Sequence, residues 1–164
     1  MSRTNEDLYP AVNAAFEFVG LTYQIAMARY EAQHTRLMNI AGISVATSGA
    51  LLVFSASVID PIRFDMTEFY AAVILFASAL VIVGIGLFTG GLNVSNPSVM
   101  YKKQLHWSDW EFKKNAIYHA GQHLERTTEV INTKHRLAAL AVLAFVGELT
   151  AAGLWINALT GTST

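Results

Sequence analysis

Three long stretches of the chain are almost entirely apolar and are separated by polar segments. Residues 37–59 and 69–92 contain no charged side chain, and residues 137–159 contain a single one, Glu148. Each stretch exceeds the length of about 20 residues that a helix needs to cross a bilayer core of about 30 Å. The pattern predicts an all-α integral membrane protein with three transmembrane helices.

The polar segments beside these spans show the heptad spacing of packed helices. Before the first span, apolar residues recur at alternating intervals of four and three: Val12, Phe16, Val19, Tyr23, Ala26 and Tyr30. After a capping box of Ser108 and Glu111, a residue of this kind recurs every seven positions: Trp110, Ile117, Leu124 and Ile131. We expect each segment to continue unbroken into the span that follows it.

Both polar segments need a packing partner, because each has one apolar face. We expect the two to pack against each other within a chain, and copies of the pair to associate into an oligomeric helical bundle. A monomeric hairpin lying on the membrane surface is the alternative.

These patterns divide the chain into four segments. Residues 1–36 form a cytoplasmic N-terminal stalk, and residues 37–92 form two transmembrane helices with a short outer loop that contains Asp60 and Pro61. Residues 93–136 form a hinge and a second cytoplasmic stalk. Residues 137–164 form the third transmembrane helix and an outer tail.

The distribution of positive charge predicts the orientation of the spans. Of the 11 Lys and Arg residues, three precede the first span, one lies in the first loop and seven lie between the second and third spans. Short cytoplasmic segments retain most Lys and Arg. We therefore expect a multi-pass protein of the bacterial inner membrane with its N-terminus in the cytoplasm.

Composition excludes several kinds of chemistry. The chain has no cysteine, which excludes disulfides and thiolate sites, and only 14% of its residues are charged. It lacks a phosphate-binding glycine loop, a nucleophile elbow and paired acids placed for hydrolysis, so we expect neither an enzyme nor a cofactor. His119 and His123 have metal-pair spacing, but no third ligand accompanies them and no metal site is predicted.

Glu148 is the most informative single residue, because a carboxylate near the middle of a span is costly unless it is sheltered from lipid. Three interpretations remain open: a protonated carboxyl that holds helices together through Ser or Thr, a group that lines an ion path, and a proton relay. Ser44, Ser48 and Ser55 share one side of the first span, and Asn157 lies near Glu148 in sequence. The candidate pore-lining set is Glu148, Ser44, Ser48, Ser55 and Asn157.

The start of the second stalk interleaves lysines with aromatic residues. Lysines attract phosphates and aromatic faces stack bases, a combination used by sites that bind nucleotides or single strands. A membrane-interface belt of Trp, Tyr and Lys is the alternative. The candidate ligand-binding residues are Lys102, Lys103, Trp107, Trp110, Lys113 and Lys114.

The order of segments resembles the SLATT-type membrane effectors of bacterial antiphage defence. The residues that carry the resemblance are 28–36 (Ala-Arg-Tyr-Glu-Ala-Gln-His-Thr-Arg), which run into the first span, and Asp60-Pro61 before the second. The likeness covers residues 8–136, and the third span exceeds the usual two-span pattern. The channel-forming effector of the Hailong system has a similar layout.

The resemblance implies a homo-oligomeric channel, tetrameric by analogy, whose opening depolarises an infected cell. It also implies control by a nucleotide or a single-stranded oligonucleotide made by a partner nucleotidyltransferase. We therefore expect a gated ion channel or permeabilising pore. The alternatives are a non-conducting scaffold or accessory subunit of a larger membrane complex and, with less support, a small proton-coupled transporter or a holin.

Overall fold

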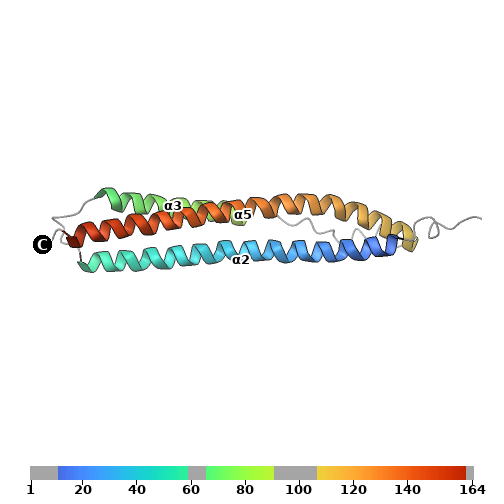
Figure 1. Ribbon diagram of the computed structural model, residues 1–164, viewed down its shortest axis with the longest axis horizontal. Coiled ribbons are helices and arrows are strands. Elements are labelled where there is room, and N and C mark those ends of the chain that lie inside the picture. Colours follow the sequence, from blue (N-terminus) through green and yellow to red (C-terminus); the bar gives the residue numbers. More distant parts are fainter. Residues whose placement is uncertain (1–10, 59–65, 91–106, 162–164) are drawn as a thin grey trace, which may run out of the picture. The chain divides into compact units, whose positions relative to one another are not determined.

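Three helices make up the part of the chain that the computed structural model describes, which is residues 11–58, 66–90 and 107–161. They are α2 (Val12–Val58), α3 (Met66–Phe88) and α5 (Asp109–Gly161), and these ranges contain no strand (Figure 1). The predicted all-α fold is confirmed. α2 has 47 residues and α5 has 53, so each predicted stalk is continuous with the apolar stretch that follows it.

The chain divides into two compact units, and α2 and α5 each contribute to both. Unit 1 comprises Met1–Ala32 and Gly90–Asn132, and unit 2 comprises Gln33–Thr89 and Thr133–Thr164. The divisions fall close to the ends that the sequence predicts for the membrane spans. That the divisions mark the membrane surface stays a prediction.

The capping box predicted at the start of α5 is confirmed. The backbone N–H and the hydroxyl of Ser108 both donate to Oε2 of Glu111, each at 3.1 Å, and the Glu111 N–H donates to the Ser108 hydroxyl at 3.3 Å. This exchange satisfies backbone donors that would otherwise lack partners in the first turn.

In unit 1, α2 packs against α5 through the face that its heptad spacing predicts. The rings of Phe16 and Phe112 lie 6.3 Å apart, and the Lys113 ammonium donates to Oδ1 of Asn13 at 2.8 Å. All six predicted seam residues of α2 are buried or half-buried, whereas Phe18 and Leu21 on the opposite side are exposed. The prediction that the two stalks pack within one chain is confirmed.

In unit 2, all three helices meet around a small apolar core of Leu37, Val83, Ala138 and Ala141. α2 and α5 run parallel, since Leu37 packs beside Ala138 and Ser48 bonds to Glu148. α3 runs antiparallel to α5, because its start contacts the end of α5 and its end contacts the middle of α5: Phe69 with Trp155, and Gly86 with Lys134. Two of these four side chains are alanine, which lets the helices approach closely.

Gly86 of α3 lies close to Leu37 of this core, which gives a testable prediction. A Cβ at Gly86 would lie 2.9 Å from Cδ1 of the fully buried Leu37, whereas a Cβ at Gly84 would meet nothing within 4 Å. Because buried overpacking costs about 1–3 kcal/mol, we expect Gly86→Ala to lower the unfolding midpoint and Gly84→Ala to leave it unchanged or raise it. Thermal unfolding in detergent, followed by circular dichroism, measures both. Equal midpoints would contradict the packing described here.

Candidate functional site

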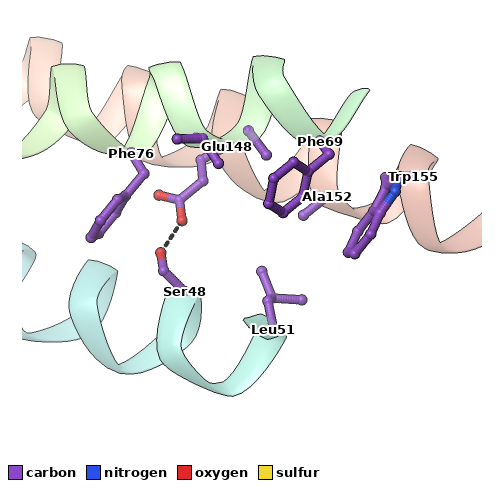
Figure 2. A pocket seen from close by; sticks show the side chains of 9 residues that line it. Ser48, Leu51, Phe69, Phe76, Glu148, Ala152 and Trp155 are labelled. Atoms are coloured by element: carbon purple, nitrogen blue, oxygen red, sulfur yellow. Dashed lines mark hydrogen bonds between the residues drawn. The ribbon is translucent and has the colours of Figure 1, made fainter. Parts of the chain in front are cut away.

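Glu148 lies inside the helix bundle of a single chain, beside a cavity of about 200 Å³. Its side chain is only 2% exposed. Oε1 accepts a hydrogen bond from the Ser48 hydroxyl of α2, and Oε2 has no hydrogen-bond partner among the described residues (Figure 2). The sequence leaves three interpretations of Glu148 open, and the structure has the hydrogen bond between helices that the first of them requires.

The other predicted pore-lining residues do not all gather here. Ser44 lies one turn before Ser48 and is also buried, at 1% exposure, and its hydroxyl has no hydrogen-bond partner in the described ranges. Asn157 is exposed on α5 and does not line the cavity. Ser55 belongs to α2, but its side chain lies outside the described residues. The structure therefore brings together Glu148 and Ser48, with Ser44 on the same face.

Aromatic side chains that the sequence analysis did not select form much of the cavity wall. Phe69 and Phe76 come from α3, and Trp155 comes from α5, two turns after Glu148. The rings of Phe69 and Trp155 lie 5.3 Å apart at 51° (Figure 2). The sequence does contain a signal for them, because Glu148 and Trp155, like Phe69 and Phe76, are seven residues apart and so share a helix face.

A second charged residue is buried in unit 2 and was not expected there. Lys134 is fully buried, and its ammonium donates to the carbonyl oxygen of Gly86 at 2.6 Å and to that of Leu87 at 3.4 Å. These carbonyls belong to the last turn of α3. Carbonyl oxygens in the last turn of a helix lack N–H partners within that helix and carry partial negative charge. Lys134 therefore caps α3, whereas its place in the sequence predicts only one of the cytoplasmic positive charges.

Four of the six candidate ligand-binding residues are described, and one of those four, Lys113, joins α5 to α2. Lys113 pairs with Asp109 at 2.5 Å as well as with Asn13, and Trp110 is half-buried on the seam. Lys114 is exposed, with its ammonium 5.1 Å from the centre of the Trp110 ring. Trp107 is half-buried, and Lys102 and Lys103 lie outside the described residues. Of the four, Lys114 is the lysine most accessible to an anionic ligand.

Within the described ranges, no group of three or more His, Asp or Glu side chains could hold a metal ion. No protein-family model matches the sequence, and searches of curated proteins and of solved structures find no match.

Proposed function

We propose that this chain is a three-span protein of the bacterial inner membrane that assembles with copies of itself into a gated channel. The continuity of α2 and α5 carries the proposal. Each helix belongs partly to unit 1 and partly to unit 2, so both units share the same two continuous helices. A ligand that prefers one arrangement of these helices in unit 1 would thereby bias their arrangement in unit 2.

The surface of unit 2 supports insertion into lipid. Two helices, Thr67–Phe88 and Asp109–Ala158, are long and apolar enough to cross a membrane. Large apolar side chains are exposed on every helix of the unit, including Val53 on α2, Ile74 on α3 and Leu143 on α5. A bundle in water would rarely expose so many on all sides. The crossing of α2 rests on residues 37–59, some of whose side chains lie outside the described residues.

The exposed face of α2 supports association between copies. Asn39, Gly42, Ala46 and Gly49 recur at intervals of three and four and are all exposed, and added Cβ atoms at Gly42 and Gly49 would meet nothing within 4 Å. Small residues allow transmembrane helices to approach closely, and a polar amide can bond across the contact. In this arrangement the copies meet along α2, with Asn39 rather than Glu148 at the contact.

The control signal in this proposal acts on unit 1. The resemblance to SLATT-type effectors favours a nucleotide or a single-stranded oligonucleotide, made by a partner nucleotidyltransferase. Lys114 over Trp110 supplies a positive charge beside an aromatic ring, the pair that such ligands use.

A non-conducting scaffold is the second candidate, and the position of Glu148 favours it. A pore shared between copies would gain most from an acidic group at the contact between subunits. Glu148 is instead enclosed within one chain and bonded to Ser48. In a scaffold, unit 2 would anchor the chain and unit 1 would dock a partner.

Bulk added at the exposed face of α2 distinguishes the two candidates. We expect Ala46→Leu to shift the detergent-solubilised protein toward monomers, because leucine prevents close approach of neighbouring helices. Its conductance in planar bilayers of phosphatidylethanolamine and phosphatidylglycerol should fall about tenfold or more. The matched control is Ala139→Leu, since Ala139 is an exposed alanine on α5. Light scattering gives the oligomeric state, and conductance is recorded with and without short single-stranded oligodeoxynucleotides.

A wild-type protein that is monomeric and does not conduct under either condition would overturn the channel and favour the scaffold. Equal loss of conductance in Ala46→Leu and Ala139→Leu would overturn the assignment of α2 to the contact between copies.

A further inference from the structure

Glu148 lines the cavity shown in Figure 2 and carries a buried Oε2 that has no hydrogen-bond partner among the described residues. The described lining of the cavity comes from all three helices and, apart from Glu148 and Ser48, consists of aliphatic and aromatic side chains. In Figure 2, one carboxylate oxygen of Glu148 is directed at Ser48 and the other lies toward the side of Phe76. A buried oxygen without a donor is costly, so the cavity is complementary to a group that brings a positive charge or a donor.

The wall selects among positively charged ligands. Small inorganic cations need several oxygen ligands, and among the described side chains of the lining only the carboxylate of Glu148 and the hydroxyl of Ser48 supply oxygen. Aromatic faces such as those of Phe69, Phe76 and Trp155 attract organic ammonium groups, whose apolar substituents can also fill the cavity. The cavity therefore fits a cation that carries its own apolar groups.

The volume indicates the size of the group that the cavity, which is partly open, can surround. An engineered cavity of about 150 Å³ accommodates benzene, whereas drug-sized ligands occupy pockets of about 300–1,000 Å³. At about 200 Å³, this cavity is suited to a ligand slightly larger than benzene.

We propose that this cavity is a binding site for a small hydrophobic organic cation, an aryl or alkyl ammonium whose charge lies on Glu148 and whose apolar groups lie against Phe69, Phe76 and Trp155. The site is formed by one chain. It goes beyond the proposed function and does not depend on conduction or on association between copies.

A pair of isosteric probes tests the proposal directly. Benzyltrimethylammonium and neopentylbenzene have nearly the same shape, but only the first carries a charge. Calorimetric titration of the full-length protein in detergent should give about tenfold or tighter binding of the cation. Glu148→Gln should remove that preference and leave binding of neopentylbenzene unchanged. The matched control is Glu125→Gln, because Glu125 is an exposed carboxylate of α5 in unit 1, and it should behave as the wild type.

A second variant keeps the test decisive if Glu148→Gln fails to fold. Phe76→Leu retains the carboxylate and removes one aromatic face, so it should weaken binding of the cation about threefold or more and that of neopentylbenzene less. Equal affinity of the two probes for the wild type would overturn the proposal and favour a protonated Glu148 in an unselective apolar cavity. Absence of binding, or unchanged selectivity in Glu148→Gln, would also overturn it.

Discussion

Lys134→Glu is expected to destabilise unit 2 by about 3–5 kcal/mol, because it places an unpaired carboxylate in a fully buried position. The lysine ammonium donates to the Gly86 and Leu87 carbonyls at the end of α3. A glutamate would face the same carbonyls with no donor, and its charge would repel the negative end of the helix dipole. Thermal unfolding in detergent, followed by circular dichroism, measures the loss.

Two matched variants separate the effect of a buried negative charge from the effect of losing the lysine donors. Lys134→Met keeps most of the side-chain volume and removes only the donors, so its cost should be about 1–3 kcal/mol. Lys114→Glu changes an exposed lysine of the same helix and should alter stability little. If Lys134→Glu and Lys134→Met unfolded at the same temperature, the capping role of Lys134 would be wrong.

The helices and their packing faces could be predicted because they depend on local patterns. Heptad spacing from Val12 to Tyr30 identified the face of α2 that packs in unit 1, and Ser108 with Glu111 identified the start of α5. The length of the stretches with little or no charge likewise predicted helices, and the structure has a helix in each of them. Such signals lie within one helix, so they do not require knowledge of which helix lies opposite.

The burial of Lys134 and the set of residues that line the cavity depend instead on which parts of different helices lie side by side. A lysine three residues before an apolar stretch is expected to lie at the membrane–water interface. Nothing in the neighbouring sequence indicates that α3 ends next to it. Its heptad relation to Ala138, Ala141 and Glu148 gave the only local sign of burial. Glu148 could be identified from its depth in a span, but its partner Ser48 is set by the register between α2 and α5.

That register also changes the role expected of the serines that share one side of α2. Ser44 and Ser48 share a face as predicted, and this face is directed into the bundle of one chain. The opposite face of α2, which carries Asn39 and Gly42, is exposed. A pore between copies would therefore involve small residues of this exposed face, and the serines would serve packing or ligand binding within a chain.

Gly90→Val is expected to destabilise unit 1 by about 3 kcal/mol, because two independent requirements for glycine meet at this position. Gly90 follows the end of α3 with φ of 63°, a left-handed conformation that costs other L-residues about 1–2 kcal/mol and is least accessible to β-branched ones. A Cβ there would also lie 2.7 Å from Cγ2 and 2.8 Å from Cγ1 of Val130. The Gly90 carbonyl accepts a hydrogen bond from the Tyr30 hydroxyl at 3.0 Å, so displacement of this backbone would disturb α2 as well.

The two causes can be separated with smaller substitutions. Gly90→Ala should destabilise the protein less than Gly90→Val. Adding Val130→Ala to Gly90→Val should relieve the steric clash and leave the cost of the left-handed backbone. Gly121→Ala is the matched control, since Gly121 is a helical glycine of α5 in unit 1 whose added Cβ would meet nothing within 4 Å, and alanine should be neutral or stabilising by up to about 1 kcal/mol. Unfolding midpoints in detergent would measure the whole series. A Gly90→Val protein as stable as the wild type would show that neither the left-handed conformation nor the contact with Val130 constrains this position.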